Sequence, residues 1–268
     1  MARAHAARSG ATLEMGPSAA VERPFSQDHW ESEKDEARLI QQSLLPTGSL
    51  RGSSFEISYN FSPYAEVGGD FADFFNLPDG RAGLYVGDVS GKGLSAAMYA
   101  ALVMGALRGI HKSGVDAAAV LELLNRRLMV RPVAGRYCAT LYATFDPKSL
   151  LLTIANAGLP YPLIASTAGC SELGPGGLPS AMFAGTTYEQ HSVQLLPGDS
   201  VLFATDGLHE LQNSEDAFWS AAELADLWQT CGKNCADDSL VTLFESVRKF
   251  SNGSGQHDDI TAVVLKVL

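Results

Sequence analysis

Four aspartates in this 268-residue chain stand where extended apolar runs begin or end. They are Asp70, Asp88, Asp206 and Asp258. In an antiparallel sheet the end of one strand lies beside the start of its neighbour, so these carboxylates are predicted to meet at one sheet edge. Like charges held that close cannot all stay ionised without a cation. Because Mg²⁺ and Mn²⁺ prefer oxygen ligands, the pattern predicts a hydrolase with two metal ions.

Asp88 has the most distinctive surroundings of the four. It follows an apolar run, and glycines stand close to it at Gly87, Gly91 and Gly93. Glycine lets the backbone turn sharply and approach an ion closely. Asp88 is therefore well placed to bridge two metal ions, with the carbonyl oxygen of Val89 as a further ligand. The alternative is an ordinary loop in which Asp88 caps the following helix.

The other three aspartates each have an ordinary alternative as well. Asp70 follows two glycines and Asp206 precedes one, and both are common settings for a turn carboxylate. Asp258 and Asp259 precede a β-rich run, where adjacent side chains face opposite ways, so one of the pair points inward and the other outward. Each motif alone is weak, whereas four such aspartates in one chain favour a shared site.

The composition limits the classes of partner. The chain has 30 acidic and 19 basic residues, a formal net charge of −11. A chain this acidic is a poor nucleic-acid binder and is repelled by anionic membranes. Its four cysteines follow no apolar leader, which predicts a cytoplasmic protein with reduced thiols. Cys231 and Cys235 could share a metal, but two small residues near a helix end are the simpler interpretation, since no second ligand pair is evident.

The chain divides into three predicted segments. Residues 1–29, rich in Ala, Arg, Gly, Ser and Pro, are predicted to be a disordered leader or the remnant of a linker. Residues 30–46 are predicted to form an amphipathic linker helix that ends at Pro46. This helix could pack on the body of the protein or pair with a second copy in a homodimer. Residues 47–268 form the main domain.

The elements of the main domain predict an α+β fold. Strands are predicted at residues 55–61, 71–77, 82–86, 137–145, 150–155, 161–165, 189–195, 201–204 and 260–267. Helices are predicted at residues 94–111, 117–129, 221–229 and 239–250, the first of them apolar almost all round and so expected to be buried. Hairpins dominate and βαβ alternation is missing, which favours a layered sandwich of antiparallel sheets with helices outside.

Seven motifs, in order along residues 36–268, resemble the metal-dependent protein phosphatase (PPM) family, which contains protein phosphatase 2C. The resemblance is closer to its bacterial SpoIIE/RsbU-type branch. The motifs are Ile40-Gln41-Gln42-Ser43-Leu44-Leu45-Pro46, Val67-Gly68-Gly69-Asp70-Phe71, residues 87–93, Asn156-Ala157-Gly158, Leu196-Pro197-Gly198-Asp199, Thr205-Asp206-Gly207 and residues 257–261.

The resemblance implies a layered α/β/β/α sandwich of two antiparallel sheets flanked by helices, with a metal site at one end. It implies that Asp88 bridges two Mn²⁺ or Mg²⁺ ions with help from the Val89 carbonyl. Asp206 and Asp258 would bind one ion, and Asp70 would hold water on the other. The implied reaction is in-line attack of a metal-activated water on phosphoserine or phosphothreonine.

The resemblance also implies partners. The usual substrate of this branch is a phosphorylated STAS-domain anti-anti-sigma factor, which after dephosphorylation binds an anti-sigma kinase. The helix ending at Pro46 resembles the regulatory linker of the family, which joins a sensor and helps dimerisation, so a separate sensor or regulator is expected. Ser90 stands where eukaryotic relatives carry a histidine proposed as general acid. Two alternatives therefore stay open, a pseudophosphatase that sequesters a STAS-type partner and a small-molecule phosphatase on the same fold.

Overall fold

The computed structural model describes residues 27–252 and 256–268, with the side chains of the first helix from residue 33 onward. Most of the predicted leader therefore lies outside the described residues. Helix α1 (Gln27–Leu44) begins three residues before the predicted linker helix and ends two residues before Pro46. A proline cannot donate the backbone hydrogen bond that would continue the helix.

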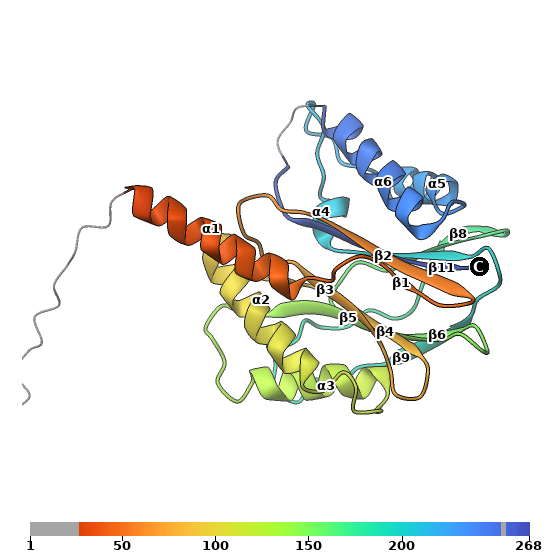
Figure 1. The fold of residues 1–268 in the computed structure, drawn as a ribbon, viewed down its shortest axis with the longest axis horizontal. Helices are drawn as coiled ribbons and strands as arrows, with labels where there is room; N and C mark the ends of the chain where they lie inside the picture. The colour runs from red at the N-terminus through yellow and green to blue at the C-terminus, as the bar shows by residue number, and fades with distance from the viewer. Residues whose placement is uncertain (1–26, 253–255) are drawn as a thin grey trace, which may run out of the picture.

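Two antiparallel sheets form the centre of the molecule (Figure 1). The first has the strand order β1 (Leu50–Arg51), β2 (Phe55–Ser62), β11 (Ile260–Val267), β10 (Ser200–Ala204), β7 (Leu163–Ser166) and β8 (Gly169–Glu172). The second has the order β3 (Phe71–Asn76), β4 (Ala82–Val89), β5 (Cys138–Asp146), β6 (Leu151–Ala157) and β9 (Gln190–Gln194). Strand β11 is buried along its whole length, which explains why its sequence is almost continuously apolar.

Helices cover the outer face of each sheet, so the predicted α/β/β/α sandwich is confirmed. Figure 1 shows α2 (Gly93–Arg108) and α3 (Ala117–Leu128) over the second sheet, and α5 (Ala221–Cys231) and α6 (Ala236–Ser251) over the first. Three apolar cores fill the spaces between the layers. One lies between α2, α3 and the second sheet, one between the two sheets, and one between the first sheet and α5 with α6.

Helix α2 differs from the prediction of a fully buried helix. Tyr99 and Val103 are buried against the second sheet, but Met98 and Leu102 on the opposite face are 69% and 54% exposed. A helix that is apolar all round does not reveal from its sequence which face is covered. The prediction of burial was therefore wrong for the outer face of α2.

The shortest elements were also missed. Strands β1 and β8 have two and four residues, too few to show an alternating pattern. Helix α4 (Asp206–His209) is a single turn and was predicted only as a turn. These elements occupy the edges of the first sheet and the end of β10.

The topology brings four strand ends to one end of the sandwich. Asp70 immediately precedes β3 and Asp88 lies at the end of β4, where Phe71 pairs with Gly87. In the other sheet Asp206 follows β10 and Asp258 precedes β11. The aspartates therefore meet between two sheets, which corrects the prediction that they share one sheet edge.

Candidate metal centre

Asp88 lies at the centre of a group of mutually interacting carboxylates. Burial, followed by the charges of Asp206 and Asp258, raises its pKa to about 7. Asp70 and Asp259 also act on Asp88, the first through a hydrogen bond and the second through its charge. Asp88 therefore interacts with the other three aspartates predicted from the sequence and with a fifth, Asp259.

Asp70 is buried and tied to the opposite sheet. Its side chain is 1% exposed, and its Oδ2 accepts a hydrogen bond of 2.7 Å from Oγ1 of Thr205. Thr205 in turn accepts a hydrogen bond of 3.0 Å from the backbone N–H of Thr261 at the start of β11. Burial, followed by the charge of Asp88, raises the pKa of Asp70 well above its usual range. The alternative interpretation of Asp70, an ordinary turn carboxylate, does not account for this burial and this contact with the other sheet.

The loop between Asp88 and α2 also differs from the capping alternative. The N-cap residue of α2 is Lys92, and no side chain caps the helix. Asp88 is four residues earlier and faces the carboxylate group, so it does not act as the helix cap. Gly91 and Gly93 have φ angles of +93° and +69°, a backbone conformation that residues with a side chain rarely adopt.

Gly69 allows the loop before β3 to lie close to the end of β4 in the same sheet. A Cβ atom on Gly69 would lie 2.8 Å from the carbonyl oxygen of Val89 and 3.0 Å from Oδ1 of Asp88. Such contacts are too short for a carbon atom, so any larger residue would push the loop before β3 away from β4. Glycine thus keeps the Val89 carbonyl and the Asp88 carboxylate close to Asp70.

The two adjacent aspartates before β11 face different environments. Asp259 is 5% exposed and accepts hydrogen bonds of 2.8 Å from the backbone N–H groups of Tyr64 and Gly69. Asp258 is more exposed, and its Oδ2 lies 2.8 Å from Nζ of Lys92. Asp259 points inward and Asp258 outward, which agrees with the predicted alternation of adjacent side chains. Asp259 therefore anchors two loops, whereas Asp258 borders the solvent.

Asp206 begins α4 and faces the same group. Burial, followed by the charges of Glu210 and Asp258, raises its pKa. His209, at the end of the same helical turn, has a pKa lowered first of all by burial. The carboxylates of Asp206, Glu210 and Asp258 therefore bring charges of one sign close together at the end of the first sheet.

The donor set suits a hard divalent cation. Within residues 27–252 and 256–268, no three Asp, Glu, His or Cys side chains close around one point as they would around a bound ion. However, crowded and buried carboxylates with raised pKa values, beside a backbone carbonyl, are the oxygen ligands that Mg²⁺ and Mn²⁺ prefer. The residues that would hold such ions are Asp70, Asp88, the Val89 carbonyl, Asp206 and Asp258.

Sequence reasoning did not single out Thr205, Gln41 or Lys92, although each contacts this region. Thr205 lies in the Thr-Asp-Gly motif directly before Asp206, and that proximity was the available signal. Gln41 reaches the site from α1, where its Nε2 donates to the carbonyl of Gly68 at 2.8 Å. Local sequence predicts none of these contacts, because the partners are distant along the chain. Thr205 pairs with Asp70, Gln41 with Gly68 and Lys92 with Asp258.

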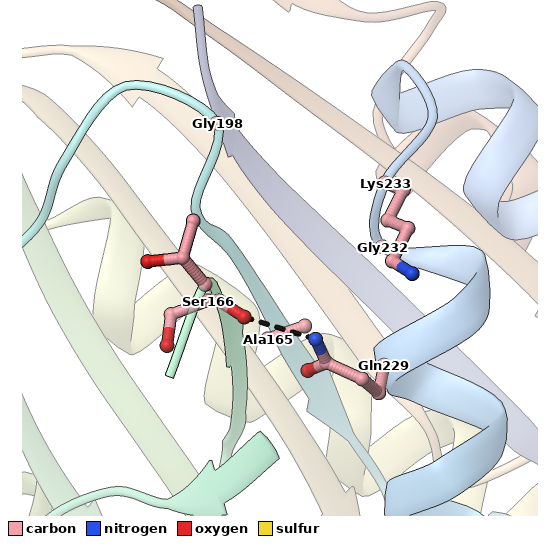
Figure 2. Close-up of a pocket in the computed structure, with 7 residues that line it drawn as sticks. Ala165, Ser166, Gly198, Gln229, Gly232 and Lys233 are labelled. Carbon is pink, nitrogen blue, oxygen red and sulfur yellow. Dashed lines mark hydrogen bonds between the residues drawn. The ribbon is translucent and has the colours of Figure 1, made fainter. Parts of the chain in front are cut away.

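A separate cavity of about 320 Å³ lies at the other end of β10 (Figure 2). It is lined by Ala165, Ser166, Thr167, Gly198, Gln229, Gly232 and Lys233. Nε2 of Gln229 donates to the carbonyl of Ser166 at 2.9 Å, as the dashed line shows. None of these seven residues carries a carboxylate, and Gly198 precedes β10 whereas Asp206 follows it. This cavity is therefore distinct from the candidate metal centre.

Among the described helices, none is both long enough and apolar enough to cross a lipid bilayer.

Comparison with known proteins agrees with the fold. The family model for stage II sporulation protein E (SpoIIE) matches residues 78–268. Phosphoserine phosphatase RsbU of Bacillus subtilis is 25% identical over 242 residues, which cover 90% of this chain and 71% of RsbU. The residues matched by the family model include strands β4 to β11 and three of the four aspartates, Asp88, Asp206 and Asp258.

Two of the solved structures that resemble this chain cover most of it. The SiaA-PP2C domain of Pseudomonas aeruginosa superposes with a TM-score of 0.77 at 20% identity, covering 90% of this chain and 97% of that domain. The RsbU and RsbW domains of a Mycobacterium tuberculosis protein give a TM-score of 0.69 at 28% identity, covering 80% of this chain and 60% of that one. Since the family model matches well over half of its residues, this chain belongs to the SpoIIE family of metal-dependent, PP2C-type protein phosphatases.

Proposed function

We propose that the chain hydrolyses phosphoserine or phosphothreonine on a signalling protein, and that this substrate is a phosphorylated STAS-domain anti-anti-sigma factor. The observation that carries the proposal is the convergence of Asp70, Asp206 and Asp258 on Asp88 at one end of the sandwich. The name of the relative RsbU, a phosphoserine phosphatase, supports the same class of substrate. Partner switching is the setting in which such a substrate would act.

The proposed metal ligands are Asp88 as the bridge between two Mn²⁺ or Mg²⁺ ions, the Val89 carbonyl, Asp206, Asp258 and Asp70. When bound, such ions supply Lewis-acid activation of water and stabilise negative charge on phosphoryl oxygens. The protein orients the ligands. Thr205 holds the Asp70 carboxylate by a hydrogen bond, and the Asp259 carboxylate fixes the loop before β3.

The exposed apolar surface beside α1 supports the proposal that a partner protein or a second copy of this chain binds there. Helix α1 packs on α2 with its inner face, as expected for a linker helix that packs on the body of the protein. Ile40 on α1 and Met98 on α2 remain 57% and 69% exposed, and they border a cavity of about 150 Å³. We therefore include in the proposal a separate regulator, or a homodimer, that covers this surface. Light scattering of Met98→Asp beside the unaltered protein tests it, with loss of the dimer or of regulator binding as the expected result.

The decisive experiment measures phosphate release from a phosphorylated STAS-domain protein with Mn²⁺, with Mg²⁺ and with EDTA. We expect release that requires the metal and that Asp88→Asn lowers by at least about a hundredfold, because the bridging ligand is lost. Asp226→Asn is the matched control, since Asp226 is exposed on α5 and the substitution removes the same charge.

Three outcomes would contradict the proposal. Full activity in Asp88→Asn would show that Asp88 is not a required ligand. Tight binding of the STAS-domain protein without metal-dependent release, from a protein that is folded, would instead support the pseudophosphatase alternative. Release from sugar phosphates or nucleotides in preference to a phosphoprotein would support the small-molecule alternative.

A further inference from the structure

Lys92 is the basic residue that reaches the carboxylate group. Among the ion pairs between described residues, only the pair of Lys92 with Asp258 involves an aspartate of the candidate metal centre. The other pairs join Arg38, Arg51, Arg81 and Arg108 to aspartates elsewhere. A phosphomonoester is a dianion, and its approach to a group of aspartates is opposed by their charge. A cation at this place would reduce that opposition.

The backbone directs Lys92 toward the group. Gly91 and Gly93, both at positive φ, flank Lys92, which is itself extended with φ −131° and ψ 165°. The side chain crosses the ring of Tyr64, with Nζ 5.3 Å from the ring centre, and Nζ donates to the backbone carbonyl of His257. Two glycines and an aromatic surface thus hold the ammonium at the border of the site.

The contact between Lys92 and Asp258 can be exchanged. The Lys92 side chain is 50% exposed, so Nζ lies where the site opens to solvent rather than in its interior. An ammonium has three N–H donors, and the structure shows them directed at one carboxylate oxygen and one carbonyl oxygen. Oδ1 of Asp258 already accepts the backbone N–H of Asp259 at 2.9 Å, so Oδ2 is the oxygen that Asp258 would offer to a metal ion.

We propose that Lys92 binds the phosphoryl group of the substrate, exchanging its contact with Asp258 for phosphoryl oxygens. This inference rests on the proposed phosphatase function and names a residue that the metal ligands do not include. If Asp258 held a metal ion through Oδ2, Lys92 would lose an anionic partner while its contact with the Tyr64 ring would keep it in place. A phosphoryl oxygen then replaces the carboxylate oxygen as the acceptor of a charge-assisted hydrogen bond.

The test compares Lys92→Met, which keeps the length of the side chain without the charge, with Lys92→Arg, which keeps the charge. Lys148→Met is the matched control, because Lys148 is exposed in the β5–β6 connection at the opposite end of the sheet. The first readout is calorimetric binding of inorganic phosphate to the Mn²⁺-loaded protein. The second is the KM and the kcat for a phosphoserine peptide. A Mn²⁺ titration of each variant provides a third readout that does not depend on turnover.

We expect Lys92→Met to weaken phosphate binding and to raise the KM by about tenfold, the effect of one charge-assisted hydrogen bond, while Lys92→Arg stays within about threefold of the unaltered protein. Mn²⁺ affinity should be unchanged or higher in Lys92→Met, because a competing cation beside Asp258 has been removed. Unchanged phosphate affinity in Lys92→Met would overturn the proposal, and so would a loss of Mn²⁺ affinity, which would mean that Lys92 maintains the site itself. If the unaltered protein binds phosphate but releases none from phosphoproteins, the proposed function fails, whereas the binding data still decide the role of Lys92.

Discussion

Gln41 of helix α1 and Gly68 of the loop before β3 exchange two hydrogen bonds. Nε2 of Gln41 donates to the Gly68 carbonyl at 2.8 Å, and Oε1 accepts the Gly68 backbone N–H at 3.1 Å. The side chain is 9% exposed, so water does not replace these bonds readily. The next residue but one, Asp70, belongs to the carboxylate group. One amide side chain therefore connects the first helix to the candidate metal centre.

We predict that Gln41→Ala destabilises the protein and weakens the site. Removing the amide leaves the N–H and the carbonyl of Gly68 buried without partners, at a cost of about 1–3 kcal/mol. The loop before β3 should then hold Asp70 less firmly, and Mn²⁺ affinity should fall. Urea denaturation and a Mn²⁺ titration measure the two effects.

Gln42 offers a control for this prediction within the same helix. It is the same residue type one position later, and its side chain is exposed. Gln42→Ala should therefore leave both the free energy of unfolding and the Mn²⁺ affinity close to those of the unaltered protein. Equal effects of the two substitutions would mean that helix propensity, rather than the pair with Gly68, explains the result.

The adjacent residues Asp258 and Asp259 should respond differently to the same substitution. Asp259→Ala removes the acceptor of two buried backbone N–H groups, and we expect a loss of about 2–4 kcal/mol in the free energy of unfolding. Asp258→Ala removes a partly exposed side chain, so the fold should be kept while Mn²⁺ affinity falls. Measuring stability and Mn²⁺ binding on both variants checks the division of roles, and a reversed pattern would show that Asp259 is the ligand.

The sandwich and its carboxylates could be predicted because their signals are local. The run that became β11 has the predicted bounds, and the strands predicted at residues 71–77 and 82–86 correspond to β3 and β4. The order of the strands within the two sheets could not be predicted, because it depends on pairing between distant segments. Residues 55–62 pair with residues 260–267, and no pattern within either strand specifies the other.

The details of the site depended on the same kind of distant contact. Asp259 is buried because its carboxylate meets the backbone N–H of Gly69, 190 residues earlier in the chain. Alternation predicted that one member of the pair would point inward but did not say which one. Likewise, the sequence shows Lys92 between two glycines, while its pairing with Asp258 appears only after β4 and β11 are placed at the same end of the sandwich.

His111 should make the stability of the protein depend on pH. Its ring is 8% exposed, Nδ1 lies 3.0 Å from the carbonyl of Leu107, and the ring packs on Phe75 with the ring centres 4.1 Å apart. Burial lowers the pKa of His111 below 6.5; the charge of Lys112 lowers it further, and that of Asp73 opposes this. The unfolded chain therefore binds a proton at a pH where the folded protein does not.

The sign of the effect follows from this difference. The contribution of neutral His111 is fully present above pH 6.5 and is lost as the pH falls from there toward the lowered pKa, with a slope of up to about 1.4 kcal/mol per pH unit. Urea denaturation at several pH values should show this loss in the unaltered protein and a smaller one in His111→Gln. Parallel pH profiles for the two proteins would mean that other groups produce the dependence.

Removing the metal should expose the cost of keeping the carboxylates together. In the metal-free protein, burial and the charges of Asp206 and Asp258 raise the pKa of Asp88 to about 7, whereas an unfolded aspartate titrates near 3.8. The folded protein therefore holds a proton that the unfolded chain has released, and the stability associated with Asp88 is lost as the pH rises from about 4 to above 7.

At pH 8 in EDTA, Asp88→Asn should be more stable than the unaltered protein by about 2 kcal/mol, because the substitution removes one charge from the group. With saturating Mn²⁺ the order should reverse, since binding to the folded state should stabilise the protein that keeps Asp88, the proposed bridging ligand, more than the variant that lacks it. Thermal denaturation of both proteins in EDTA and in Mn²⁺ measures the two differences. An unaltered protein that is the more stable of the two in EDTA would show that the carboxylates do not repel one another in the folded state.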